Sequence, residues 1–202
     1  MATQAPPLAP PERISLEEYL TAYDGSAAEW VDGTVIPMSP VSDHHQDIVD
    51  FLGALLRHLV EERDAGIVRT SQIAMHIGNA ARVPDILFLS SEHLVRRKQT
   101  LVEGPADLVI EVVSPESRIR DRGEKFYDYE VGGVREFWLV DPLRETVDLF
   151  RLGRDGRYVS VAPVESGRLE SEVLPGFWII PTWLWKQPLP KLNTVLAEWG
   201  LI

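Results

Sequence analysis

The segment Pro105-Ala106-Asp107-Leu108-Val109-Ile110-Glu111-Val112-Val113-Ser114-Pro115 decides the fold class of this chain. Residues 107–113 form a mostly apolar run rich in β-branched side chains, which predicts a buried strand in the middle of a sheet. Ser114-Pro115-Glu116 then supplies a cap, a helix-opening proline and a first-turn acid, so we expect a helix that continues to about Glu130. A buried strand that leads directly into a helix indicates a sheet covered by helices.

Capping, turn and periodicity patterns predict more elements on the N-terminal side of this strand. These are a short helix opened by Ser15 and Glu18, a hairpin over Glu29–Ile36 that turns at Asp32-Gly33, a long amphipathic helix from Ser42 to about Arg63, and strands over Ile67–Ile77 and Val83–Leu89. The long helix carries its apolar residues at steps of three and four, which gives it one buried stripe.

After a helix stop at Gly132-Gly133, apolar runs separated by turn residues predict a meander of strands and a closing helix. The strands cover Glu136–Asp141, Thr146–Leu152 and Tyr158–Ala162, an aromatic and proline-rich segment covers Val173–Trp185, and the short helix lies around Asn193–Trp199. This order predicts an α/β or α+β protein with a mixed β-sheet flanked by helices. We expect a flexible proline-rich arm over residues 1–12 and a single domain over residues 13–202.

The composition excludes several classes of protein. Of the 202 residues, 45% are hydrophobic and 25% are charged, so the chain is long and apolar enough to bury a core. It has no cysteine, which excludes disulfides, thiolate nucleophiles, iron–sulfur clusters and cysteine-bound zinc. Its 31 acidic and 20 basic side chains give a formal net charge of −11, which argues against tight, indiscriminate binding to nucleic acid.

The chain shows no pattern for export or membrane insertion. Its first residues, Met1 to Pro7, lack the basic and apolar regions of a secretory signal. No apolar stretch approaches the roughly 18 residues that a membrane-spanning helix needs. We therefore expect a cytoplasmic protein without a membrane partner.

Two acidic residues stand on predicted strands. Asp85 follows Pro84 near the start of one strand, and Glu111 lies 26 residues later inside the apolar run. A carboxylate among apolar neighbours is costly unless it is paired, protonated or bound to a metal ion. Two of them on neighbouring strands would form a site of hard oxygen ligands suited to Mg²⁺ or Mn²⁺. Alternatively, each carboxylate caps a loop or pairs with an arginine such as Arg82.

Several segments follow one another in an informative order: Glu29-Trp30-Val31-Asp32-Gly33, Ser39-Pro40 with His45, Val83-Pro84-Asp85-Ile86, Pro105 to Pro115, Asp121 with Lys125 and Tyr129, Gly133 to Pro142, and Leu174-Pro175-Gly176-Phe177. Together, over about residues 12–185, they resemble the Uma-two family of restriction-endonuclease-like proteins, in the PD-(D/E)xK nuclease superfamily. Each segment alone is a weak pattern, so the resemblance rests on their order and spacing.

The resemblance implies a restriction-endonuclease-like core and metal-dependent cleavage of nucleic acid, with DNA as the expected substrate. Asp85 and Glu111 would ligate Mg²⁺ (or Mn²⁺), with the backbone carbonyl of Val112 as a third oxygen. The ion would lower the pKa of a bound water and neutralise charge on the scissile phosphate. Glu29 matches an acid that the family carries before the main core, which implies a supplementary ligand or a positioning role.

One position departs from the superfamily pattern. Val113 stands where a lysine is expected two residues after the glutamate, and the family moves this lysine onto the following helix, where Lys125 fits. A long ammonium side chain can reach a strand end from a neighbouring helix and orient or activate the attacking water. The alternative is an exposed pair of Asp121 and Lys125, four residues apart, worth only about 0.2–0.5 kcal/mol.

Other residues allow more than one interpretation. His45, at the start of the long helix, could contact phosphate or ligate the metal, or it could be a polar residue near the cap that faces water. Tyr129 could support the site or pack in the core. The basic stretches Arg118–Lys125 and Arg96-Arg97-Lys98 could offer local positive charge or be solvated. The aromatic residues of Val173–Trp185 could stack on bases, but their apolar neighbours favour a core or a subunit interface.

Two functions from different classes remain open at this point. The first is a Mg²⁺-dependent endonuclease with Asp85, Glu111, Lys125, Glu29 and His45 at its site. The second is a nuclease fold without cleavage that serves as a binding or assembly module, which the acidic balance and the missing lysine beside Glu111 would suit. We expect a homodimer. A paired-carboxylate glycosidase ranks last, because nothing in the sequence indicates a sugar-binding groove.

Overall fold

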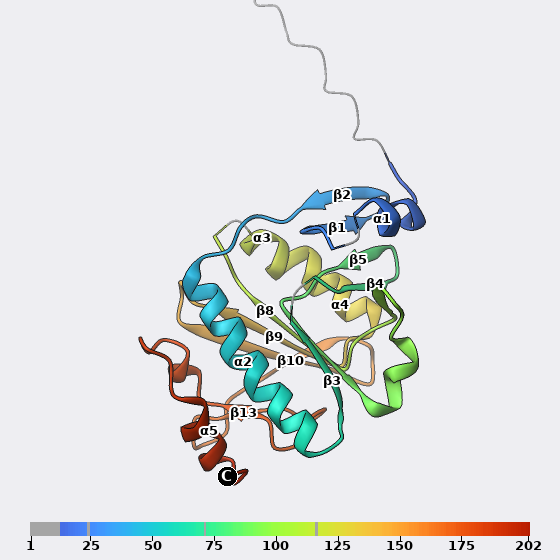
Figure 1. Cartoon of the computed structure of the whole chain (residues 1–202). Coiled ribbons are helices and arrows are strands. Elements are labelled where there is room, and N and C mark those ends of the chain that lie inside the picture. The colour runs from blue at the N-terminus through green and yellow to red at the C-terminus, as the bar shows by residue number, and fades with distance from the viewer. Residues whose placement is uncertain (1–12, 24, 71, 116) are drawn as a thin grey trace, which may run out of the picture.

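The computed structural model describes residues 13–23, 25–70, 72–115 and 117–202 (Figure 1). The predicted proline-rich arm over residues 1–12 and the predicted first-turn acid Glu116 lie outside the described residues. Within them, the chain forms two large mixed β-sheets flanked by helices and a small third sheet. The predicted α+β class is confirmed, although the strands divide between two large sheets instead of forming one.

The larger sheet, six strands as far as the chain is described, is the framework of the molecule. Its order is β11 (Tyr158–Val161), β10 (Thr146–Leu152), β9 (Glu136–Asp141), β8 (Leu108–Val112), β6 (Ile86–Ser90) and β3 (Gly66–Thr70). β8 and β9 run parallel, and the other neighbouring pairs of this sheet are antiparallel. Because β8 lies between β6 and β9, the apolar run that predicted an interior strand does form one.

Helices and helical turns connect and cover the strands. They are α1 (Leu16–Ala22), α2 (Asp43–Glu62), the 3₁₀ helix η1 (Ser91–Arg96), α3 (Arg118–Arg120), the π-helical turn η2 (Asp121–Lys125), α4 (Phe126–Gly132), the 3₁₀ turn η3 (Pro181–Trp183) and α5 (Leu192–Glu198). The first predicted helix has its capping box, and Ser42 caps the long one as expected. None of the described helices is long and apolar enough to cross a membrane.

The helix predicted directly after β8 begins later than expected. Ser114 and Ser117 exchange hydrogen bonds between the backbone amide of each and the side-chain oxygen of the other, at 3.0 and 3.1 Å. These bonds form a turn, and the helical hydrogen bonds start only at Arg118. The predicted stop is confirmed, because Gly133 follows α4 with a φ of 88°, which favours glycine.

The second large sheet contains five strands of the described chain. Its order is β2 (Thr34–Pro37), β1 (Ala28–Val31), β5 (Ala80–Arg82), β4 (Ala74–Ile77) and β7 (Leu101–Glu103). The predicted hairpin is confirmed as β1 and β2, with positive φ values of 48° at Asp32 and 86° at Gly33. Such values are those of the turns that match the twist of paired strands.

Two strand predictions before β8 are wrong in their extent. The expected strand Ile67–Ile77 is divided between β3 in the larger sheet and β4 in the second sheet, and Gln72 between them has a φ of 60°. The expected strand Val83–Leu89 begins only at Ile86, since Pro84 has no amide hydrogen for the ladder. Asp85 therefore stands just outside β6.

Side-chain alternation along β8 decides on which side of the sheet the candidate site residue Glu111 lies. The alternate residues Leu108, Ile110 and Val112 pack in one hydrophobic cluster with α2 and the C-terminal segment. Val109 and Val113 pack in another, with α4 and strands of the second sheet. Glu111 shares the periodicity of the second set, so its side chain lies on the side of the sheet that α4 covers.

The C-terminal aromatic segment lies in the core. Phe177 is fully buried, and Trp178 and Trp183 are 8% and 6% exposed. They pack in the cluster that contains α2, near the small sheet of β12 (Leu169–Glu170) and β13 (Trp178–Ile179). Core packing is therefore the correct interpretation of these three side chains, and base stacking is not.

Candidate active site

Asp85 and Glu111 face each other across two neighbouring strands. The register pairs Ile86 of β6 with Ile110 of β8, and one step further along both strands places Asp85 opposite Glu111. The amide of Val112 donates a hydrogen bond of 2.7 Å to Oδ2 of Asp85 and holds that carboxylate in place. The side chain of Glu111 is 3% exposed and that of Asp85 is 15% exposed, so the pair joins a buried carboxylate to a more accessible one.

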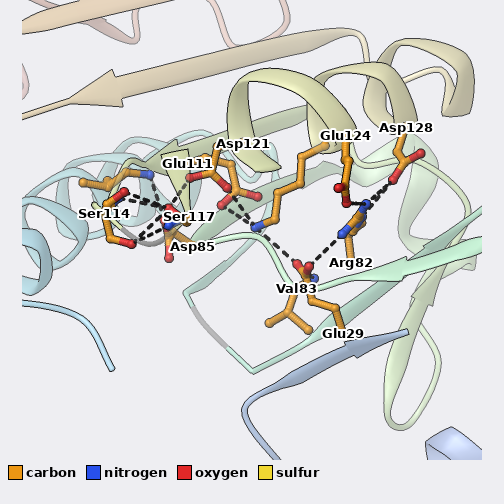
Figure 2. Close-up of polar contacts among 12 residues, drawn as sticks. Glu29, Arg82, Val83, Asp85, Glu111, Ser114, Ser117, Asp121, Glu124 and Asp128 are labelled. Carbon is orange, nitrogen blue, oxygen red and sulfur yellow. Dashed lines mark hydrogen bonds and ion pairs between the residues drawn. The ribbon is translucent and has the colours of Figure 1, made fainter. Parts of the chain in front are cut away.

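Lys125 brings an ammonium group between three carboxylates. Its Nζ lies 2.9 Å from Oε2 of Glu111, 3.2 Å from Oε1 of Glu29 and 3.6 Å from Oδ1 of Asp121. Figure 2 shows these three acidic side chains converging from different elements. All four side chains are buried, so the alternative of an exposed Asp121–Lys125 pair is wrong.

The π-helical turn η2 directs its buried side chains toward Glu111. Asp121 and Lys125 are the buried residues of η2, and Tyr129 continues the same row on α4. The hydroxyl of Tyr129 donates a hydrogen bond to Oε1 of Glu111, and the hydroxyl of Ser117 donates one to Asp121. π-Helical turns occur frequently at functional sites, and this one places a carboxylate and an ammonium group at the end of β8.

Glu29 and Arg82 support the ammonium group from the second sheet. Glu29 on β1 is fully buried and accepts a hydrogen bond of 2.9 Å from Nη1 of Arg82 on β5. Nη2 of Arg82 lies 2.7 Å from Oδ2 of Asp128, which joins β5 to α4. In the described chain Arg82 pairs with these acids and with Glu124, so its expected alternative role as a partner of the strand-end carboxylates is wrong.

His45 lies beside Asp85. Its Nε2 is 3.3 Å from Oδ2 of Asp85, and the residue is 5% exposed. Ser42 accepts a hydrogen bond from the amide of His45 and so caps α2, which brings the imidazole to the strand end. Within the described residues the Nδ1 atom of His45 is buried without a hydrogen-bond partner. The imidazole therefore contacts the site instead of facing open water.

A pocket of about 40 Å³ joins these residues. Its lining contains Glu29, Asp85, Glu111, Asp121, Lys125, Arg120, His45 and Val112, together with Met38, Ser39, Val41, Ser114 and Ser117. A water needs roughly 10–15 Å³ of such space, so the pocket has room for about three. Among the described residues, no three histidine or acidic side chains are already arranged as ligands of one metal ion.

The acidic side chains of the pocket perturb one another. Burial raises the pKa of Glu111 well above its usual value, and the charges of Asp85, Asp121 and Glu29 raise it further, while Lys125 opposes them. Burial lowers the pKa of Lys125, but the carboxylates around it outweigh burial, and the net shift is upward. The ammonium group therefore stays charged, and four carboxylates share the pocket with two basic side chains.

The structure brings together all the residues that the sequence singled out for the site. Asp85, Glu111, Val112, Lys125, Glu29 and His45 line one pocket. The sequence analysis missed the burial of the Asp121–Lys125 pair and the buried position of Arg82. A usable signal for Arg82 was present, because an arginine within the apolar segment Ala80–Val83 needs a buried acidic partner.

A comparison with protein-family models covers most of the chain. The model of the Uma2 family, described as "Putative restriction endonuclease", matches residues 16–183. This chain belongs to the Uma2 family. The resemblance found in the sequence is confirmed, and membership of Uma2 supports a nuclease.

Two relatives of this Uma2 chain extend the comparison. "Uncharacterized protein slr1290" of Synechocystis sp. (strain ATCC 27184 / PCC 6803 / Kazusa) is 28% identical over 169 residues, which are 81% of this chain and 87% of the relative. The crystal structure of a protein described as "a putative nuclease belonging to DUF820", from Anabaena variabilis ATCC 29413, has a TM-score of 0.70 at 18% identity. The structural match covers 85% of this chain and 97% of the Anabaena chain, and it confirms the nuclease-like fold.

Proposed function

We propose that this protein is a metal-dependent endonuclease that hydrolyses phosphodiester bonds in nucleic acid, with DNA as the expected substrate. One observation carries the proposal: Asp85, Glu111 and Lys125 place two strand-end carboxylates and an ammonium group in a single pocket. Phosphoryl transfer depends on positioning and on positive charge near the phosphate, and it needs no covalent nucleophile from the protein. Membership of the Uma2 family supports the same class of reaction.

The side chains of the pocket fit Mg²⁺ or Mn²⁺, which prefer oxygen ligands. Asp85 and Glu111 offer carboxylate oxygens, and the carbonyl of Val112 belongs to the same strand end. Both oxygens of Glu111 already accept a hydrogen bond, but a carboxylate has about four lone-pair sites and can accept more. The excess of acidic over basic side chains in the pocket is what a divalent cation would neutralise.

The residues of the pocket would divide the chemistry among them. A bound divalent ion supplies a water of lowered pKa and offsets the charge that develops on the phosphate. Lys125 donates hydrogen bonds and positive charge, and it does not act as a base, because three carboxylates hold its ammonium group. This favours orienting the attacking water over removing its proton. Glu29 acts through Lys125, and His45 acts through Asp85, as positioning residues.

The acidic balance of the chain limits the expected affinity for nucleic acid. At a formal net charge of −11, long-range repulsion opposes a polyanion, so binding should be selective and sensitive to salt. The homodimer and the single domain over residues 13–202 stay predictions.

A cleavage assay tests the proposal on single- and double-stranded DNA and RNA, with Mg²⁺, with Mn²⁺ and with EDTA. We expect cleavage that requires the divalent ion. Glu111→Gln and Asp85→Asn should lose about 100- to 1,000-fold in rate, the usual effect of removing a group that stabilises transition-state charge. Glu103→Gln is the matched control, since it makes the same change in a side chain that is 53% exposed and outside the pocket.

The outcomes separate the two functions that the sequence left open. Full activity in both Glu111→Gln and Asp85→Asn would overturn the proposal. Metal binding without cleavage of any of the four substrates would favour a nuclease fold that binds or assembles and does not cut.

A further inference from the structure

A positively charged cluster lies away from the pocket. It consists of Arg57 on α2, Arg69 on β3 and Arg97 directly after η1, and both α2 and η1 contact β3. β3 is the edge strand of the six-stranded sheet, and it lies beside the C-terminal half of α2 (Figure 1). Arg57 and Arg69 line a cavity of about 110 Å³ together with Gly66, Ile67 and Val68 of β3.

The three arginines have no close acidic partner among the residues that the structure describes. The ion pairs of the described residues involve other arginines and leave Arg57, Arg69 and Arg97 out. One acidic side chain, Glu61, lines the cavity. Burial lowers the pKa of Arg69, and the charges of Arg97 and Arg57 lower it further, so both neighbouring arginines repel the Arg69 guanidinium group.

Arg69 is held at the edge of the sheet. Its Nη1 donates a hydrogen bond of 2.8 Å to the carbonyl of Val68, its chain neighbour on β3. Because the guanidinium group has five N–H donors, this bond leaves others free for a ligand. Guanidinium groups bind phosphate through two parallel hydrogen bonds, and they do so more specifically than lysine.

We propose that Arg57, Arg69 and Arg97 form a phosphate-binding site for the backbone of the nucleic-acid substrate, an inference that rests on the proposed function. A cavity of about 110 Å³ has room for a phosphate group, since a single water occupies roughly 10–15 Å³ by the same measure. The cluster supplies the local positive charge that an acidic protein needs to hold a polyanion.

The position of the cluster along β3 suits a substrate that also enters the pocket. Arg69 is paired with Leu87 on β6, and Leu87 is two residues from Asp85, roughly 7 Å along the strand. One strand of a duplex advances about 3.4 Å per nucleotide. Arg57 lies twelve residues after His45 on α2, about 18 Å along the helix axis. A phosphate at the cluster would therefore lie roughly two to five nucleotides from one in the pocket.

The test measures binding separately from cleavage. Fluorescently labelled duplex DNA is titrated with the full chain in EDTA at several salt concentrations. The double variant Arg57→Gln with Arg69→Gln should bind more weakly, and the slope of log affinity against log salt should fall by about 1.8, because each phosphate contact contributes about 0.9.

The matched control removes the same charge elsewhere. Arg144 and Arg154 lie in the turns after β9 and β10, the Arg144 side chain is 52% exposed, and Arg154 is exposed. Arg144→Gln with Arg154→Gln should leave the salt slope unchanged. An equal loss in both double variants would mean that net charge alone matters and would overturn the site, as would unchanged binding in the cluster variant.

Two further measurements distinguish free phosphate from the DNA backbone as the ligand, and distinguish failure of this inference from failure of the proposed function. Displacement of DNA by inorganic phosphate at equal phosphate concentration would assign the cluster to free phosphate and overturn the backbone assignment. If the wild type cleaves DNA but the Arg57→Gln with Arg69→Gln variant binds DNA as tightly as the wild type, the proposed function is supported and the phosphate-binding site is overturned. If the double arginine variant binds DNA more weakly but Glu111→Gln still cleaves DNA, the phosphate-binding site is supported and the proposed active site is overturned.

Discussion

Two buried carboxylates stand at the two ends of β8, in opposite environments. Asp107 directly precedes the strand and is 1% exposed, and Glu111 lies near its other end and is 2% exposed. Asp107 accepts a hydrogen bond of 2.8 Å from the amide of Ser90 and lies 2.8 Å from Nδ1 of His93. Glu111 has two donors, Lys125 and Tyr129, but it shares its pocket with three further acidic side chains.

The pKa shifts of the two carboxyl groups run in opposite directions. Burial raises the pKa of Asp107, but its hydrogen bonds to Ser90 and His93 outweigh burial, and the net shift is downward. For Glu111, burial and the neighbouring acids raise the pKa. A buried acid surrounded by donors stabilises the fold, whereas one surrounded by acids weakens it and marks a site that awaits a cation or substrate.

Removing one side-chain partner of the carboxylate at each end of β8 should have the largest and most unequal effects on stability. Lys125→Met leaves three buried carboxylates without their ammonium group and should lower the free energy of unfolding by about 3–5 kcal/mol at pH 7 without metal. His93→Ala should cost only about 1 kcal/mol, because Ser90 still donates to Asp107. Urea denaturation measures both values, and equal losses would contradict the contrast between the two ends.

Divalent metal should stabilise the protein through the Glu111 end of β8 and not through the Asp107 end. At 100 times its dissociation constant, Mg²⁺ should raise the free energy of unfolding by about 2.7 kcal/mol, seen as an increase in Tm. Asp85→Asn should abolish the increase, and Asp107→Asn should retain it. The expectation fails if the Asp85 variant is stabilised as strongly as the wild type.

The pH dependence of stability at the Asp107 end should be a smaller effect than the loss of Lys125. Because the folded-state pKa of Asp107 is lowered, its ionised form stabilises the protein above the unfolded value of 3.8, and this contribution is lost as the pH falls through the folded pKa. Asp107→Asn should therefore cost about 1–3 kcal/mol at pH 7 and progressively less below about pH 4. Denaturation from pH 3 to 7 tests this, with Glu103→Gln as a control that should stay within about 0.5 kcal/mol. A cost that grows on acidification would contradict the assigned sign.

Local patterns predicted much of the fold. The capping box at Ser15, the Asp32-Gly33 turn and the apolar run of β8 each depend on neighbouring residues, and each was confirmed. Predictions became wrong where the chain changes sheet, as between β3 and β4. Hydrophobic periodicity describes the faces of a strand, but it carries no information about which sheet the strand joins.

The sequence by itself singled out Asp85, Glu111 and Lys125 as candidate site residues, and it determined the family, which the family model confirms. Only the tertiary structure decided how their charges are balanced. Glu29 reaches the ammonium group from a second sheet and is itself held by Arg82, and η2 turns Asp121 inward. The balance depends on contacts between residues distant in the chain, and burial strengthens those contacts by excluding water.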